Sequence, residues 1–471
     1  MKKIESLRFS VLVVCLLHFT APCIGQDESV GAPMVRAEQE ALYNTIQDFV
    51  GKWWNGSDLY PDPCGWTPIQ GVSCDLYDGF WYVTDLSIGP VHDNSLTCSQ
   101  DVDFSPNLFA LRHLKSLSFF NCFVTPRRRA VSIPAGDWEV LAGTLESLEF
   151  RSNPGLTGTV PQIFGGLRNL RSLVITENGL MGQLPESIGN LVELRRLNLA
   201  GNSFAGRVPG SIGGLSRLLI LDMSGNALSG TLPATLGGLT ALLKLDLRDN
   251  RIEGEIPSEI RNLENLTLLD LSDNRLSGGL GESIQELRSL QELVLSNNPI
   301  GGDIMSIGWQ DLNCVTALDL ANTSLTGGIP ESLTHLKSLR FLGLNDNKLT
   351  GDIPSNIATL PNASAIYLHG NNLTGELSFP ELFYRRMGRR FGAWGNPSLC
   401  YQAELESPTY APFGVKPCRP RVIKYEIGLD PSPNFDENRS HHPASSVPCL
   451  EFKVFSVRGL LLLVEAFLVL A

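Results

Sequence analysis

Carboxylates recur along this sequence at a spacing that could support chemistry. Four aspartates directly follow a leucine and occupy one position of a repeated phrase, namely Asp222, Asp246, Asp270 and Asp319. A row of carboxylates can ligate a metal ion or act in general acid–base catalysis. Aspartates that recur once per strand more often bond to groups within the surface of the sheet. We favour this structural role.

Catalytic partners for these carboxylates are not evident. The histidines His92, His113, His335 and His369 are scattered, and no Cys-x-x-Cys, His-x-x-x-His or phosphate-binding glycine loop is present. The net charge of −12 argues against a nucleic-acid partner. We therefore predict a protein that is not an enzyme and has no catalytic residue, no metal site and no cofactor.

The repeated phrase reads L-x-x-L-x-L-x-x-N-x-L-x-G-x-I/L/V-P. Its asparagine position falls at 153, 178, 202, 226, 250, 274, 298, 323, 347 and 371, with Thr at 323, so successive copies are 24 or 25 residues apart. The leucines predict a short strand with one apolar side, and stacked copies predict a parallel sheet. The asparagine can donate and accept hydrogen bonds towards neighbouring repeats. Gly and Pro at the end suit a tight bend and an extended return segment.

The amino-terminal segment predicts export and a cap before the repeats. An apolar run after Arg8 is typical of a secretory signal peptide that ends near Gly25, which permits disulfides and glycans. Residues 34–50 predict an amphipathic helix with Ala37, Ala41, Leu42, Ile46 and Phe49 on its apolar side and Glu38 mostly elsewhere. Cys64 and Cys74 lie close together before the first strand, which indicates a disulfide. Segments 82–88 and 114–119 resemble two degenerate strands, and Cys98 with Cys122 would close the insert between them.

The phrase and its flanks resemble the extracellular part of plant leucine-rich-repeat receptor-like proteins and receptor kinases. The specific words are the L-x-G-x-I-P ending, Asp62-Pro-Cys64 with Gly71-Val-Ser-Cys74, and Trp394-Gly-Asn-Pro-Ser-Leu-Cys400 with Lys416-Pro-Cys418. The resemblance implies an α/β repeat: a leucine-rich-repeat solenoid with a parallel β-sheet on its concave face and caps closed by disulfides, including Cys400 with Cys418. It also implies a cell-surface protein without a kinase domain that responds to a root-colonising fungus.

Seven segments are expected along the chain. They are a signal peptide (1–25), an N-terminal cap (26–81), degenerate repeats with inserts (82–144), ten regular repeats (145–384), a C-terminal cap (385–418), a linker (419–458) and an apolar tail (459–471). No kinase domain fits after Cys418. The tail, with small residues at Ala444 to Ser446 before it, fits a glycolipid-anchor signal. A membrane span or a freely secreted protein stays open. Cys449 would leave with an anchor signal, and we expect Cys314 to be a buried, inert thiol.

The solvent side of the strands is the predicted binding surface. Residues six, four and two positions before each asparagine should face the concave side, and their mixed charge suits a peptide or protein partner better than a small-molecule pocket. The candidate partner-binding residues are Arg151, Thr176, Arg196, Asn198, Asp222, Lys244, Asp246, Arg248 and Asp270. Charge reversal at Arg196, Lys244 and Arg248 together, with folding intact, is expected to abolish partner capture.

The positions of the glycosylation signals restrict which part of this surface is predicted to bind the partner. Sequons begin at Asn55, Asn265, Asn322, Asn362, Asn372 and Asn438, and none lies between Asn55 and Asn265. The repeats from Ser147 to Arg248 are therefore expected to stay bare. Basic clusters at 127–129 and 385–390 could dock an acidic partner, but solvated loops and a charged cap helix are the more ordinary interpretation.

The sequence thus favours an extracellular binding protein at the outer face of the plasma membrane. It is expected to hold a peptide or protein ligand on its concave face and to signal through a leucine-rich-repeat receptor kinase. The alternative is a soluble or wall-associated binding or inhibitor protein that needs no kinase partner.

Overall fold

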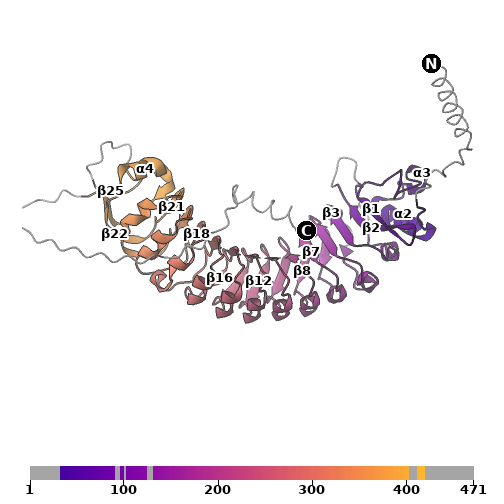
Figure 1. The fold of residues 1–471 in the computed structure, drawn as a ribbon, viewed down its shortest axis with the longest axis horizontal. Coiled ribbons are helices and arrows are strands. Elements are labelled where there is room, and N and C mark those ends of the chain that lie inside the picture. Colours follow the sequence, from indigo (N-terminus) through magenta and orange to yellow (C-terminus); the bar gives the residue numbers. More distant parts are fainter. Residues whose placement is uncertain (1–31, 91–95, 100–101, 125–130, 403–410, 419–471) are drawn as a thin grey trace, which may run out of the picture. The chain divides into compact units, whose positions relative to one another are not determined.

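The computed structural model describes residues 32–90, 96–99, 102–124, 131–402 and 411–418 (Figure 1). The chain divides into two compact units after Thr157. Several sequence-based predictions lie outside these residues, namely the signal peptide, the linker, the tail, Asn438, Cys449, His92 and the basic cluster at 127–129. In the described part of the chain, no helix is long and apolar enough to cross a bilayer.

The N-terminal unit combines helices with the first strands. Its elements are α2 (Arg36–Val50), α3 (Gly56–Leu59), β1 (Val72–Tyr77), β2 (Phe80–Ile88), η1 (Pro106–Ala110), β3 (Ser116–Phe120), β4 (Val131–Ser132), η2 (Trp138–Leu141), β5 (Ser147–Arg151) and β6 (Leu156–Gly158), where η denotes a 3-10 helix. Strands β2, β3 and β5 are parallel, as the two degenerate strands predicted. The sequence missed β1, which pairs antiparallel with β2 and contains Cys74.

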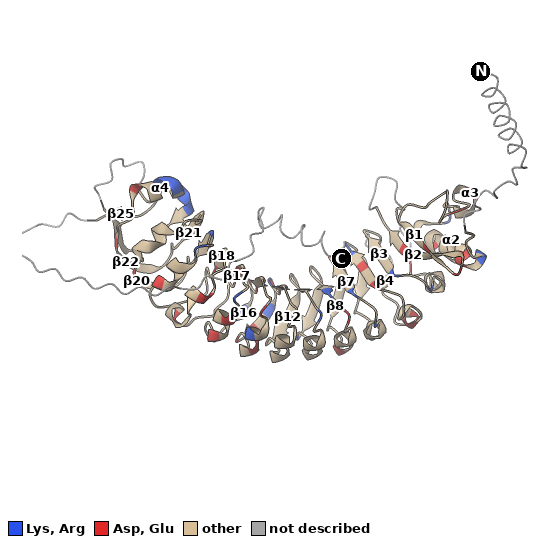
Figure 2. Ribbon diagram, in the orientation of Figure 1, with Lys and Arg blue, Asp and Glu red and all other residues tan. Residues whose placement is uncertain are grey.

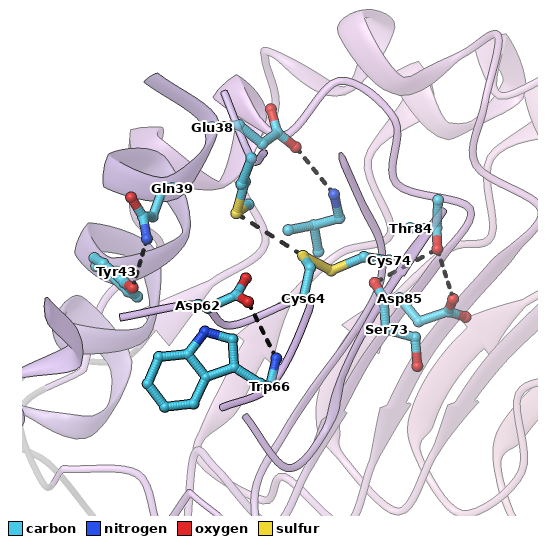
Figure 3. Close-up of a disulfide and its surroundings, with 12 residues drawn as sticks. Glu38, Gln39, Tyr43, Asp62, Cys64, Trp66, Ser73, Cys74, Thr84 and Asp85 are labelled. Atoms are coloured by element: carbon cyan, nitrogen blue, oxygen red, sulfur yellow. Dashed lines mark hydrogen bonds between the residues drawn. A yellow bond between two sulfur atoms is a disulfide. The ribbon is translucent and has the colours of Figure 1, made fainter. Parts of the chain in front are cut away.

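The predicted apolar face of the first helix is partly wrong. Leu42, Ile46 and Phe49 are fully buried, but Ala37 is exposed and Glu38 is 7% exposed. Glu38 Oε1 accepts a hydrogen bond from the backbone N–H of Val83 on β2, at 3.3 Å (Figure 3). This bond turns the face that carries Glu38 towards the sheet. Burial raises the pKa of Glu38 above its ordinary value.

Disulfides close both ends of the described chain. Cys64 bonds to Cys74 (Figure 3), Cys98 to Cys122 and Cys400 to Cys418, which are the pairings expected from the sequence. The prediction of a buried free thiol at Cys314 is wrong, because this half-buried residue is also disulfide-bonded. Position within a regular repeat carries no sign of such a bond, so the sequence pattern could not reveal it.

The C-terminal unit contains a parallel sheet with one short strand per repeat. Neighbours pair in register, so that Leu245 lies between Leu221 and Leu269, and all three leucines are fully buried. In order across the sheet, the strands are β7 (Ser172–Thr176), β9 (Arg196–Asn198), β11 (Ile220–Asp222), β13 (Lys244–Asp246), β15 (Leu268–Asp270), β17 (Glu292–Val294), β18 (Ala317–Asp319), β19 (Phe341–Gly343), β21 (Ala365–Tyr367) and β23 (Phe391–Gly392). Residues beside each central leucine point to the opposite face.

The segment after each proline is a turn of 3-10 helix, where the sequence had predicted an extended return. These helices lie on the outer side of the unit (Figure 1) and comprise η3 (Gln162–Gly166), η4 (Glu186–Asn190), η5 (Gly210–Gly214), η6 (Ala234–Gly238), η7 (Ser258–Asn262), η8 (Glu282–Glu286), η9 (Ile304–Ser306), η10 (Trp309–Asp311), η11 (Glu331–His335) and η12 (Ser355–Thr359). In η7, for example, Ile260 is fully buried beneath the turn. A single turn suffices to return an apolar side chain to the core between two strands.

Shorter strands follow the ladder asparagines, and the C-terminal cap completes the unit. The strands are β8 (Gly179–Gly182), β10 (Ser203–Gly206), β12 (Ala227–Gly230), β14 (Arg251–Gly254), β16 (Arg275–Leu276), β20 (Thr350–Asp352), β22 (Asn372–Leu377), β24 (Ser398–Tyr401) and β25 (Lys416–Pro417), and the cap adds α4 (Glu381–Met387) and η13 (Gly388–Arg390). Gly206, Gly230 and Gly254 have φ of 80°, 76° and 80°, as the predicted bend requires.

The asparagine ladder is confirmed and extends to Asn396. Asn274 Nδ2 donates to the carbonyl oxygens of Leu247, Leu271 and Ser272 at 2.9, 3.1 and 3.0 Å. Its Oδ1 accepts from the backbone N–H of Ile252 at 3.0 Å. Leu247 and Ile252 belong to the preceding repeat, so each rung ties two repeats together.

Candidate binding surface

The solvent side of the strands in the C-terminal unit is the candidate functional surface, and we call it the sheet face. It consists of the residues six, four and two positions before each ladder residue. In the repeat that contains β13 these are Lys244 and Asp246 on the strand and Arg248 just after it. Because the strands are in register, each column places like positions side by side on neighbouring strands.

An ion-pair network occupies the middle of the sheet face, and we call it the charge network (Asp222, Lys244, Asp246, Arg248 and Asp270). Lys244 Nζ lies 3.3 Å from Asp222 Oδ2 and 3.4 Å from Asp246 Oδ2. The Arg248 guanidinium lies 3.1 Å from Asp246 Oδ2 and 3.5 Å from Asp270 Oδ2. The structure thus brings together five of the residues that the sequence selected.

The aspartates of this row also bond to their own backbone. Oδ1 of Asp222 accepts hydrogen bonds from the N–H and the hydroxyl of Ser224, at 3.1 and 2.7 Å. Asp270 makes the same two bonds with Ser272, at 3.0 and 2.6 Å. These contacts agree with the structural role that the sequence favoured for the aspartate row. In the described part of the chain, no group of three His, Cys, Asp or Glu side chains is arranged to hold a metal ion.

Asp246 is the most constrained carboxylate of the network. Its side chain is 1% exposed, and burial, reinforced by the nearby charge of Asp222, raises its pKa to about 6, although Lys244 and Arg248 oppose the shift. In the unfolded chain an aspartate titrates at about pH 4. The folded protein therefore binds a proton at Asp246 more readily than the unfolded chain does between about pH 4 and pH 6.

We expect Asp246→Asn to flatten the dependence of stability on pH. The raised pKa contributes stability that is present below the unfolded pKa and is lost as the pH rises through about 6. The free energy of unfolding should be measured at about pH 4 and about pH 7 by thermal or denaturant unfolding. Between these two pH values, the stability of the variant relative to the wild type should rise by on the order of 2 kcal/mol. An unchanged pH dependence would show that Asp246 titrates normally. The amide can still accept the 3.3 Å bond from the Arg248 N–H.

The other predicted residues are spread over both units. Arg151 lies in the N-terminal unit and pairs with Glu149 at 2.8 Å. Thr176, Arg196 and Asn198 are half-buried on β7 and β9, and Asn198 Oδ1 accepts from the Ala200 N–H at 3.1 Å. Arg196 is in register with Ile220 at the edge of the charge network.

An aromatic group at the far end of the sheet face was missed from the sequence. His369 stacks on Trp394 with ring centroids 4.1 Å apart and planes at 12°. Tyr367 lies 5.9 Å from Phe341 and 6.0 Å from His369, while Phe413 lies 5.7 Å from Trp394. The sequence analysis selected residues six, four and two positions before the ladder residues only as far as Asp270. The same three positions in the later repeats include every member of the aromatic group except Phe413, and they also include Glu292.

The edges of the unit carry the sequons and a basic cluster. Asn265, Asn322, Asn362 and Asn372 are exposed, and so is Asn55 in the N-terminal unit. Asn265 and Asn362 hold equivalent positions, and each donates to a carbonyl 25 residues earlier, at 3.0 and 2.8 Å. Figure 2 shows basic residues gathered at α4, and the exposed arginines are Arg385 and Arg386 on α4 and Arg389 and Arg390 on η13. A charged cap helix, the ordinary interpretation, describes this cluster.

Comparison with known sequences places the chain among repeat proteins of plants. Family models described as Leucine Rich Repeat match residues 143–204, 217–239, 241–263, 265–287, 314–336 and 338–360. Piriformospora indica-insensitive protein 2 of Arabidopsis thaliana is 66% identical over 422 residues, which cover 87% of this chain and 98% of that protein. Protein TOO MANY MOUTHS of the same plant is 37% identical over 147 residues, 30% of this chain and 27% of that protein.

Solved structures share the fold. The crystal structure of a TDR receptor matches with a TM-score of 0.56 and 27% identity, over 64% of this chain and 50% of that one. The plant peptide hormone receptor RGFR1 in complex with RGF2 matches with a TM-score of 0.53 and 28% identity, over 72% of this chain and 61% of that one. The repeat fold agrees with these solved structures. The chain belongs to the plant leucine-rich-repeat receptor-like protein family that includes Piriformospora indica-insensitive protein 2.

Proposed function

We propose that this protein is a cell-surface receptor-like protein without a kinase domain. It binds a peptide or protein partner on its concave face and signals through a partner receptor kinase. Export by the predicted signal peptide and attachment to the outer face of the plasma membrane through the tail, as an anchor signal or a membrane span, belong to the same proposal. So does glycan attachment at the sequons.

The character of the sheet face is the observation that carries this proposal. One open surface displays the charge network and the aromatic group, with Lys244, Tyr367, His369 and Trp394 half-buried and Arg248 exposed. Half-exposed aromatic and guanidinium side chains are the residues on which protein interfaces most depend. The plant peptide hormone receptor RGFR1, which shares the fold, was solved in complex with RGF2.

The partner-binding residues remain those selected from the sequence. They are Arg151, Thr176, Arg196, Asn198, Asp222, Lys244, Asp246, Arg248 and Asp270. The absence of sequons between Asn55 and Asn265 supports this part of the chain as the bare side. The aromatic group extends the proposed surface towards the C-terminal cap.

The cue is proposed from the relative. The name of Piriformospora indica-insensitive protein 2 refers to a response to Piriformospora indica, and the high identity supports a similar role for this chain in the response to a root-colonising fungus. The sheet face itself does not specify the ligand.

Affinity capture tests this function. The bait is the folded, secreted chain from Gln26 to Ser440, applied to crosslinked plant membranes beside a mock bait, and the products are identified by mass spectrometry. Reproducible enrichment of a receptor-kinase ectodomain is the expected result. Recovery of wall proteins or glycans with no kinase at any crosslinker length would contradict the proposal and support the soluble or wall-associated alternative.

A further inference from the structure

Glu292 is a buried carboxylate that the fold does not satisfy. It begins β17 on the sheet face and is 8% exposed. Its carboxylate has no hydrogen bond or ion pair to any residue in the described ranges. Burial and, to a smaller extent, the nearby charge of Asp270 raise its pKa, although the charge of Lys244 opposes the shift. A buried ionised group without a partner is costly, so such a group points to a missing counter-charge.

Two further carboxylates flank the same place. Val294, two residues after Glu292, lies in register between Asp270 and Asp319. Strands are about 4.8 Å apart, so the two aspartates stand on either side of Val294 with their backbones about 10 Å from one another. Asp270 also raises the pKa of Asp319, after the larger effect of burial. The three acids therefore share one electrostatic environment, which we call the acidic opening (Asp270, Glu292 and Asp319).

Small residues surround Val294 in the acidic opening. Val294, Ala317 and Ala321 are half-buried, and Gly343 has no side chain at the position next to Asp319. The nearest cations are already paired in the charge network, Lys244 with Asp222 and Asp246, and Arg248 with Asp246 and with Asp270 of the opening itself. The face columns of β17, β18 and β19 hold no Lys or Arg.

We propose that the acidic opening receives one arginine side chain of the bound partner, with the guanidinium over Val294 and between the three carboxylates. This inference rests on the proposed function and names the chemistry that the partner must present there. A guanidinium is planar and has five donors, so it can bond two carboxylates at once while its face covers the Val294 methyl groups. An ammonium has no such flat face.

A metal ion fits the same carboxylates less well. In the described part of the chain, no three acidic or His side chains converge as metal ligands. Asp319 Oδ1 already accepts the Ala321 N–H at 3.1 Å. Carboxylates spread over neighbouring strands match an extended cation better than a compact divalent ion.

The test uses N-acetyl-arginine amide, whose only charge is the guanidinium, and its uncharged isostere N-acetyl-citrulline amide. Each is titrated into the secreted ectodomain and followed by ligand-observed NMR. We expect the arginine probe to bind about tenfold more tightly than the citrulline probe, because charge-assisted hydrogen bonds are the stronger ones. N-acetyl-lysine amide should fall between them.

Substitutions of two acids of the opening test whether the arginine probe binds there. Glu292→Gln with Asp319→Asn should remove the preference for arginine, since the amides keep the shape and lose the charge. Glu282→Gln, an exposed acid on η8, is the matched control and should change nothing. Thermal unfolding of each variant checks the fold. Equal binding of arginine and citrulline to the wild type, or a preference that survives the double substitution, would overturn the inference.

Failure here is distinguishable from failure of the proposed function. If the wild type captures a receptor kinase but shows no arginine preference, only the inference fails. If the preference is present and no kinase is captured, the acidic opening stands and the proposed signalling route fails.

Discussion

Replacing Asn274 by alanine is expected to destabilise the C-terminal unit by about 3 kcal/mol or more. The side chain is 8% exposed and makes four hydrogen bonds, two of them to the preceding repeat. Its loss leaves the Ile252 N–H and several carbonyls unpaired in a buried place, at about 1–3 kcal/mol for each group that finds no water. Denaturant unfolding followed by circular dichroism measures the effect.

Thr323→Ala provides the control at the ladder position without asparagine. The Thr323 hydroxyl lies 2.7 Å from the Leu320 oxygen in its own repeat and 3.0 Å from Asn347 Oδ1 in the next. The preceding repeat is joined through the backbone, because the Gly301 N–H donates to the backbone carbonyl oxygen of Thr323 at 2.8 Å. We expect Thr323→Ala to cost clearly less than Asn274→Ala. Equal costs would mean that the bonds between repeats add little.

Lys244→Glu is expected to destabilise the same unit by about 3–5 kcal/mol, the range for breaking a buried ion pair. The Lys244 side chain is 14% exposed and lies between Asp222 and Asp246, whose side chains are 9% and 1% exposed. The substitution removes the cation that Asp222 and Asp246 share. It also adds a carboxylate to a network that already contains Asp222, Asp246 and Asp270. Thermal unfolding should show a large loss near neutral pH and a smaller loss in acid, where the carboxylates are protonated.

Arg275→Glu is the matched control for charge reversal. Arg275 is an exposed residue at the start of β16, and an exposed charge contributes little to stability. A loss as large as that of Lys244→Glu would contradict a specific role for the charge network. Combined reversal at Arg196, Lys244 and Arg248 therefore perturbs the fold together with the surface, and it cannot test partner capture cleanly.

The repeat columns explain why so much of the fold could be predicted. A leucine pattern with a fixed step dictates buried central residues, parallel register and an asparagine ladder, because each repeat must satisfy the same neighbours. The cysteine positions near the two ends likewise predicted three disulfides. The repeat pattern and the close pair Cys64 and Cys74 depend on local spacing, whereas the pairing of Cys400 with Cys418 was implied by the family resemblance.

Features that depend on long-range contacts escaped the sequence. Glu38 is buried against β2, where it accepts a hydrogen bond from the Val83 N–H, and Cys314 is disulfide-bonded although its repeat gives no sign of it. The aromatic group combines Phe341, Tyr367 and Trp394 from three repeats, each of which is unremarkable alone.

The sequence analysis overlooked the position directly before each ladder residue, although its residue preference has a plain physical cause. The residue before each ladder position adopts a left-handed backbone, as in Gly225 with φ of 62° and Asp249 with φ of 52°. Gly, Asn and Asp tolerate this conformation at the lowest cost, which accounts for their frequency there.

A glycan placed on the sheet face tests partner binding there most directly. Ala200→Thr creates the sequon Asn198-Leu-Thr on β9. Glycosylation does not use Asn198 Oδ1, so the hydrogen bond that this oxygen accepts from the backbone can remain. Val192→Thr creates Asn190-Leu-Thr at the end of η4, where Asn190 is exposed and Val192 is 53% exposed. Mass spectrometry confirms that each new site is occupied.

Capture of the receptor-kinase ectodomain by the two glycosylated baits is the measurement. We predict that the Ala200→Thr bait loses the partner while the Val192→Thr bait captures it as well as the wild type does. Undiminished capture by a folded Ala200→Thr bait that carries the glycan would contradict binding on the sheet face.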